Sequence, residues 1–114
     1  MSEYLILLYV DERASAAMSD ADRAELLERH GAFQQKHGEA IRGGDALQPS
    51  ATARTIHTGD GGVGVTDGPY AETKEALGGF YLIEAPHLDA AVAIAADVPA
   101  PNGGVEVRPI LVLG

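Results

Sequence analysis

The chain has 114 residues, enough for one hydrophobic core and too few for two, so we expect a single domain over residues 1–114. Its formal net charge is -9, which repels phosphate backbones and anionic lipid headgroups and argues against nucleic-acid and membrane partners. The sequence contains no cysteine, which excludes disulfides, thiolate nucleophiles and thiolate metal sites.

The first predicted element is a strand over residues 4–10. Tyr4 to Val10 is a continuous β-prone run closed by charged residues, so the strand should lie near the centre of a sheet. No basic segment precedes this run, and Glu3 stands there instead, so it does not resemble a signal peptide or a membrane span. Together with the absence of cysteine, this start favours a cytoplasmic location.

A long helix and a hairpin are expected next. Ser19, with Asp22 three positions on, resembles a helix-capping pair and predicts a helix that runs to about Arg42, where two glycines stop it. After a loop at residues 47–50, short strands at 53–58 and 63–66 flank a glycine-rich turn and predict a hairpin.

The remaining elements are a strand, a helix and a strand. The run at 79–85 predicts a strong strand, and Pro86 precedes a helix whose apolar residues recur at helical spacing until Pro99. The last strand is expected over residues 105–113, and Pro109 places it at a sheet edge or at a bulge.

This order predicts an α+β fold of the ferredoxin-like βαββαβ type with an extra β-hairpin. Both helices would then cover one face of an antiparallel sheet. Because the strands at 4–10 and 79–85 are apolar at successive positions, the second face should also be apolar. We therefore expect a homodimer in which two sheets pack face to face; the alternative is that the hairpin or a terminus folds over the open face.

A family resemblance rests on residues 67–84, which read Asp-Gly-Pro-Tyr-Ala-Glu-Thr-Lys-Glu-Ala-Leu-Gly-Gly-Phe-Tyr-Leu-Ile-Glu. This block, with similar segments at residues 4–7, 47–49, 53–56 and 105–110, closely resembles the YCII-related proteins of the DGPF type. The resemblance implies a small bacterial cytoplasmic protein that forms a dimeric α/β-barrel from ferredoxin-like subunits. Some such proteins occur beside, or fused to, extracytoplasmic-function sigma factors, so a sigma factor is an expected partner. In the wider group a His and Asp pair is thought to form an active site.

The candidate catalytic residues are His30 and Asp67. His30 lies on the predicted apolar stripe of the first helix, where an imidazole is either a satisfied core residue or an acid-base group. Asp67 begins an Asp-Gly-Pro turn, and its carboxylate either only shapes the turn or orients an imidazole across a cleft. The DGPF type usually has no fixed histidine on this helix, so placing the pair here extends a property of the wider group.

The candidate ligand-binding residues are His37, Arg54, Glu72 and Lys74. His37 shares the helix stripe with His30, and Lys74 is placed to bind an anionic group if its loop lines a cleft; a solvated, self-neutralising loop is the alternative. His30 and His37 would lie about 10 Å apart along the helix, too far to share one metal ion, so neither metal nor cofactor is expected.

Two functions of different class follow. The first is a small-molecule enzyme that performs elimination or isomerisation by metal-free acid-base chemistry, with His30 as base and Asp67 as its orienter. The second is a non-catalytic dimeric module that binds a ligand or a protein through the loop at residues 67–75. An enzyme should have an imidazole and a carboxylate in contact within a pocket, whereas a binding module should expose the charged loop.

Overall fold

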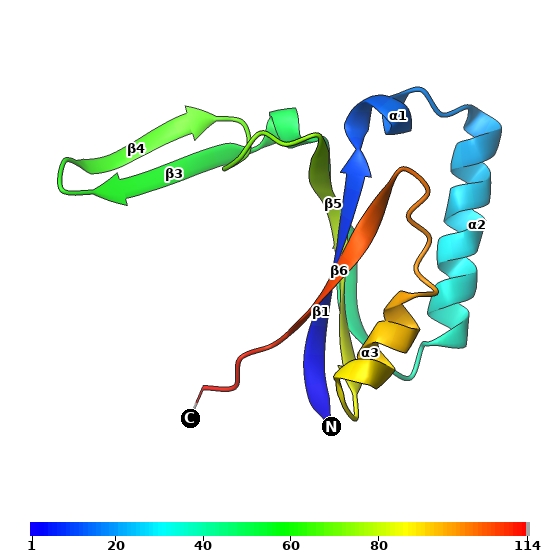
Figure 1. Cartoon of the computed structure of the whole chain (residues 1–114). Helices are drawn as coiled ribbons and strands as arrows, with labels where there is room; N and C mark the ends of the chain where they lie inside the picture. The colour runs from blue at the N-terminus through cyan, green and yellow to red at the C-terminus, as the bar shows by residue number, and fades with distance from the viewer. Residues whose placement is uncertain (114) are drawn as a thin grey trace.

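A computed structural model describes residues 1–113 (Figure 1). Gly114, the last residue of the predicted domain, lies outside the described residues. The elements in chain order are β1 (Ser2–Asp11), α1 (Glu12–Ala16), α2 (Asp20–Lys36), β2 (Ile41–Ala46), a 3-10 turn η1 (Ser50–Thr52), β3 (Arg54–Gly59), β4 (Gly62–Asp67), β5 (Glu75–Ala85), α3 (Leu88–Ala95) and β6 (Gly103–Pro109).

Four of the strands form one antiparallel sheet in the order β2-β5-β1-β6, and β3 pairs with β4 in a separate hairpin. Helices α2 and α3 lie on one side of the sheet (Figure 1). This is the predicted ferredoxin-like α+β fold, in which the hairpin is inserted between β2 and β5. β1 is central and β6 is an edge strand, as their sequences predict.

The core lies between the sheet and the two helices. Every second residue of β1 faces it, beginning with Tyr4, Ile6 and Leu8, and β5 contributes Tyr81 and Ile83 from the neighbouring strand. The helices complete it with a few side chains: Phe33 of α2, and Ala91 and Ala95 of α3.

The opposite side of the sheet, which we call the open face, is also apolar. Its side chains come from three cross-strand pairs of β1 and β5: Leu5 with Leu82, Leu7 with Phe80, and Tyr9 with Leu77. All six are partly exposed, and Leu77 keeps 38% of its surface in solvent. The prediction that β1 and β5 are apolar on both faces is therefore confirmed; the homodimer that it suggested stays a prediction.

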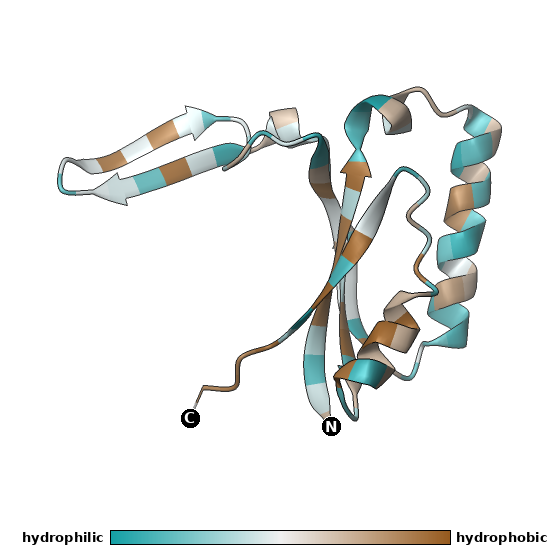
Figure 2. Cartoon of the chain, in the orientation of Figure 1, coloured by the Kyte–Doolittle hydropathy of each residue, from teal (hydrophilic) through white to brown (hydrophobic). Residues whose placement is uncertain are grey.

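The hairpin β3–β4, which we call the arm, projects from the side of the sheet opposite the helices, and so does the C-terminal segment, residues 110–113 (Figure 1). Brown bands alternate with paler ones along the arm, and the C-terminal segment is brown (Figure 2). Ile56, Val63 and Val65 of the arm and Leu111 to Leu113 are all exposed. In the single chain, neither segment folds down over the open face in the way that the alternative required.

The predicted extent of the first helix is wrong. Ser19 caps α2 as expected, its hydroxyl accepting a hydrogen bond from the Asp22 amide at 3.1 Å, but α2 ends at Lys36 and residues 41–46 form β2. The glycines that we took for a helix stop lie inside this strand, where β5 approaches closely: a Cβ on Gly44 would lie 2.6 Å from the Phe80 carbonyl oxygen.

Smaller differences lie at two further places. The short helix α1 was not predicted; it is capped by Asp11, whose carboxylate accepts hydrogen bonds from two backbone amides of the first turn. The last strand ends at Pro109 rather than at residue 113: Pro109 pairs with Tyr4, and the Ile110 amide donates one further hydrogen bond to the Glu3 carbonyl at 3.0 Å, close to the start of β1. Among the described residues, no helix has the length and apolar character needed to cross a membrane.

Candidate functional site

The Asp-Gly-Pro motif, residues 67–69, connects the arm to the rest of the domain. Gly68 has a positive φ of 99°, its amide donates to the Ala53 carbonyl at 2.8 Å, and its carbonyl accepts from the Thr55 hydroxyl at 2.7 Å. Asp67 pairs with Arg54 across the hairpin, with Oδ1 3.0 Å from Nε. Thr55 is the one buried polar side chain among the described residues. Its hydrogen bond to Gly68 therefore fixes the position of the loop that follows β4.

A cavity of about 650 Å³, which we call the arm cleft, opens beside this junction. Tyr9 and Leu77 contribute apolar surface from the open face, and Tyr70 comes from the loop after β4. The remaining walls are residues 47–50, 52–53, 69–71, 73 and 75–76, and Glu75 supplies the one ionisable carboxylate of the lining. A cleft of this size, mostly apolar with a few polar groups, fits a small organic molecule.

Glu12 holds one wall of the arm cleft in place. Its carboxylate accepts a hydrogen bond from the Ser50 amide at 2.7 Å and a second from the Ser50 hydroxyl, at the first residue of η1. These hydrogen bonds from Ser50 hold the pKa of the Glu12 carboxyl below its usual value. The start of α1, directly after β1, is thereby tied to η1, 38 residues later in the chain.

His30 lies on the helix side of the sheet and is bound by Tyr81. Its Nδ1 is 2.8 Å from the Tyr81 hydroxyl, which also accepts from the Gln34 amide at 3.2 Å. Tyr81 can donate to Nδ1 while its oxygen accepts from Gln34, and this arrangement leaves the proton of the neutral imidazole on Nε2. Burial, and secondarily the charge of Arg29, lower the pKa of His30 and favour this neutral form. In this tautomer Nε2 is a donor and does not act as a base.

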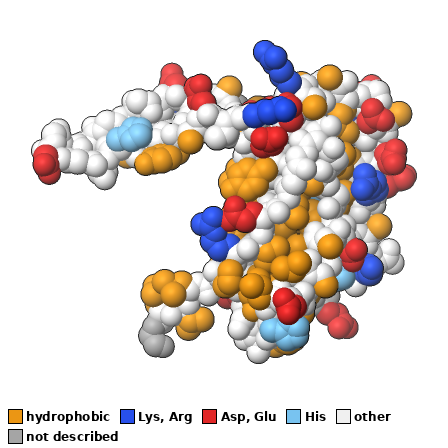
Figure 3. Space-filling model, in the orientation of Figure 1, with side chains coloured by type: hydrophobic (Ala, Val, Ile, Leu, Met, Phe, Trp, Pro, Cys, Tyr) orange, Lys and Arg blue, Asp and Glu red, His pale blue; other side chains and the backbone are white. Residues whose placement is uncertain are grey.

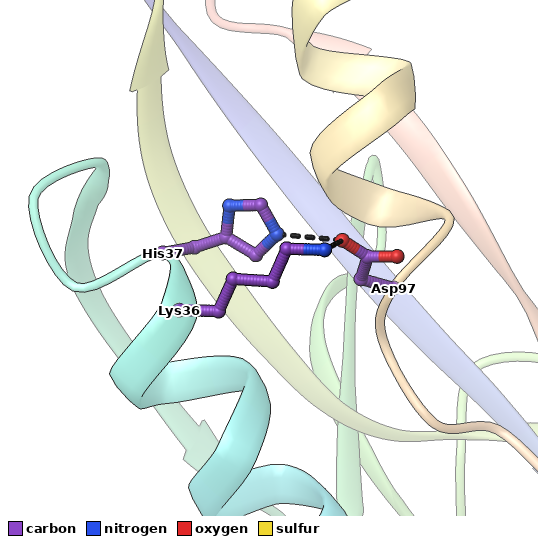
Figure 4. Close-up of polar contacts among 3 residues, drawn as sticks. All are labelled: Lys36, His37 and Asp97. Carbon is purple, nitrogen blue, oxygen red and sulfur yellow. Dashed lines mark hydrogen bonds and ion pairs between the residues drawn. The ribbon is translucent and has the colours of Figure 1, made fainter.

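An imidazole and a carboxylate do meet, but they are His37 and Asp97 (Figure 4). His37 Nε2 lies 2.8 Å from Asp97 Oδ2, and the Lys36 ammonium lies 3.0 Å from the same oxygen. Hydrogen bonds from His37 and Lys36 lower the pKa of Asp97. The cluster joins the C-terminal end of α2 to the residues after α3, and neither His37 nor Asp97 lines the arm cleft or the second cavity, of about 360 Å³, beside Tyr81. We interpret it as a structural clasp.

The predicted pair of His30 and Asp67 is not formed within the chain. His30 is a residue of α2 and contacts Tyr81 on the helix side of the sheet, whereas Asp67 belongs to the arm on the other side, with 87% of its side chain exposed. Leu27, three residues before His30 on α2, is 74% exposed. The assignment of catalytic roles to the two residues stays a prediction.

The predicted ligand-binding residues are scattered. His37 belongs to the clasp, Arg54 is paired with Asp67, and Glu72 and Lys74 are exposed on the loop of the signature motif. None of the four lines the arm cleft, although the loop that carries two of them forms part of its wall. The charged loop is therefore exposed, which is the arrangement expected of a binding module.

Sequence reasoning missed the residues that do line the cleft. Tyr9 and Tyr70 both line the cleft. From the sequence alone, Tyr9 was interpreted only as part of a buried strand and Tyr70 only as one residue of the motif at 67–84. One signal was present: the motif places an aromatic residue directly after a Gly-Pro turn, where it cannot join the sheet. Tyr70 lies 5.8 Å from His57 between ring centroids and remains 83% exposed. Among the described residues there is no cluster of three or more His, Cys, Asp or Glu that would hold a metal ion.

The sheet order, the two covering helices and the inserted arm define a ferredoxin-like α+β domain with a cleft at the base of a hairpin. The family model of the YCII-related domain matches residues 2–113, and the chain belongs to that family. A relative from Rhizobium meliloti (strain 1021), "Uncharacterized protein R00369", is 39% identical over 112 residues, covering 94% of this chain and 90% of the relative. The finer DGPF assignment stays a prediction.

Proposed function

We propose that this YCII-related protein is a homodimeric binding module that holds a small, largely apolar molecule in the arm cleft. The observation that carries the proposal is the composition of the cleft: aromatic and aliphatic walls from Tyr9, Tyr70 and Leu77, hydroxyl groups from Thr52 and Thr73, and a single carboxylate. Apolar walls supply affinity, and the few polar groups supply orientation.

The ligand is expected to be neutral or cationic. Glu75 is the charged side chain of the lining, and the whole chain carries -9, so an anion would be repelled both locally and at long range. An aromatic ring with an amine or hydroxyl group matches these walls, because it stacks on tyrosine and donates to a carboxylate or a threonine.

Binding is favoured over the His30–Asp67 enzyme because each of those side chains already has a different partner. Arg54 neutralises Asp67, and Tyr81 occupies Nδ1 of His30. A sigma factor as partner, which the family resemblance implies, stays a prediction.

The binding test is a titration with N-phenyl-1-naphthylamine, a neutral aromatic amine, followed by backbone amide chemical shifts. Shifts should cluster at residues 47–53 and 69–77. Ala71→Trp fills the cleft from an exposed position and should weaken binding at least about tenfold, whereas Ala51→Trp, exposed on η1 but outside the lining, should not. Shifts confined to the open face, or none at all, would reject the cleft as the site.

The dimer is proposed to form through the open face. Leu7 lies near its centre, so Leu7→Asp should place a charge in the contact and yield monomers in sedimentation velocity. Leu27→Asp makes the same change on the exposed side of α2 and should leave the dimer intact. Equal masses for the two variants would contradict this interface.

A further inference from the structure

The arm has one apolar side and one polar side. Ile56 pairs with Val65 and Thr58 with Val63 on one side, while His57 and Thr66 lie on the other. The apolar side chains are strongly exposed: 63% for Ile56, 70% for Val63 and 62% for Val65. A two-stranded hairpin is marginally stable in water, so a hairpin with an apolar side needs a surface against which to bury it.

The single chain is unusually extended for its length. Its radius of gyration is 16.1 Å, against about 13 Å for a compact domain of this size. The principal extents are 48 × 47 × 18 Å, so the molecule is wide and thin. In the space-filling view the arm, the body and the C-terminal segment surround a concave side that carries hydrophobic side chains (Figure 3).

The net charge of the chain limits which kinds of partner can bind in this concave side. A chain with net charge -9 repels nucleic acid and anionic membranes, so an apolar protein surface is the remaining fit. The open face of this same chain is such a surface. Its charged β6 residues, Glu106 and Arg108, form an ion pair with each other, so this edge of the face adds no net charge to the contact.

The open face alone is smaller than a typical stable dimer interface, which favours a contact that includes the arm. Four strands about seven residues long give an open face of roughly 19 by 23 Å, or about 440 Å² in projection. A stable interface buries about 800 Å² on each partner. The arm adds two strands of six residues, roughly 200 Å² in projection, so the sheet with the arm approaches the size that a stable dimer needs.

We propose that the arm is a dimerisation element: its apolar side, Ile56, Val63 and Val65, packs on the second copy that is bound through the open face. This inference rests on the dimer proposed above. It adds that the arm, at whose base the arm cleft lies, contributes to the contact between the two copies.

The test compares Val65→Asp with Thr66→Asp, adjacent exposed residues on opposite sides of the same strand. Sedimentation equilibrium should show the dimer dissociation constant raised roughly 100-fold or more by Val65→Asp, and little changed by Thr66→Asp. Val63→Asp, farther toward the tip of the arm, should repeat the effect. Circular dichroism should match wild type in all three, because the arm lies outside the core.

The outcomes separate this inference from the dimer itself. If Leu7→Asp gives monomers but Val65→Asp and Val63→Asp stay dimeric, the open-face dimer stands and the arm proposal is overturned. If wild type is already monomeric, both fail. If wild type is a tetramer that Val65→Asp reduces to a dimer, the arm joins copies at a different contact, which overturns its place in the open-face dimer.

Discussion

The phenol oxygen of Tyr81 is the most informative single atom to remove. Tyr81 is 8% exposed, and its hydroxyl contacts both His30 and Gln34 between β5 and α2. Tyr81→Phe keeps the ring, which packs against Phe33 at a tilt of 55° with centroids 4.8 Å apart, and deletes only the hydrogen bonds. The change therefore isolates the polar part of the contact between helix and sheet.

The expected loss follows from what each partner can do afterwards. Gln34 is exposed and can turn its amide to water, so its loss is small. His30 is half-buried, and its Nδ1 loses a partner where water reaches it less easily. Together we expect about 1–2 kcal/mol of lost unfolding free energy, which lowers the melting temperature by roughly 4–8 °C.

Urea unfolding measures this directly, because the midpoint should fall while the slope stays constant. Tyr70→Phe makes the same chemical change on a residue that is 83% exposed, and it should stay within about 0.5 kcal/mol of wild type. If Tyr81→Phe is as stable as Tyr70→Phe, the hydroxyl carries no net stabilisation and our account of His30 is wrong.

The contact between His30 and Tyr81 should also make the stability of the fold depend on pH. Burial lowers the pKa of His30 below its usual 6.5, so below pH 6.5 the unfolded chain binds a proton that the folded chain refuses. The contribution of His30 to stability is thus complete above pH 6.5 and is lost progressively as the pH falls from 6.5 through the lower pKa of the folded state. His30→Gln keeps an acceptor for Tyr81 but does not titrate, so its stability should vary less with pH in this window.

Three further changes test other parts of the structure. Asp67→Asn removes an exposed ion pair with Arg54 and should cost about 0.5 kcal/mol or less in urea unfolding; complete unfolding would contradict this. Asp97→Asn should lower the melting temperature at neutral pH. Because the folded-state pKa of Asp97 lies below 3.8, the difference from wild type should shrink below pH 3.8 and vanish once the pH is below the folded-state pKa. Gly103→Ala should cost roughly 3 kcal/mol or more, since the new Cβ would lie 1.7 Å from the Tyr9 carbonyl oxygen; wild-type stability would show that β6 does not approach β1 so closely.

The sequence predicted those elements whose pattern is local. The apolar run of β1, the Ser19 cap of α2 and the glycine turn of the arm each lie within a few residues, and each was confirmed. β2 was missed because its six residues include two glycines and two charged side chains, and its strand conformation comes from pairing with β5.

The candidate site was harder to predict because it depends on contacts between distant segments. The helical stripe correctly placed Phe33 in the core and turned His30 and His37 toward the body. It could not identify their partners: Tyr81 lies on β5 and Asp97 follows α3, and neither has a local signal for this role. The arm cleft likewise assembles from three stretches that are distant in the sequence, at Tyr9, residues 47–53 and residues 69–77, so no single motif encodes it.

The weak attachment of α2 has a consequence for how the domain opens. This helix has seventeen residues, and Phe33 is its one buried side chain, whereas β1 and β5 pair along nearly their whole length at the centre of the sheet. Local opening requires little apolar surface to be exposed when the few contacts are concentrated at one spot. We therefore expect α2 to detach as a unit while the sheet stays folded, so its amides exchange with solvent through a low-energy partial unfolding and not through global denaturation.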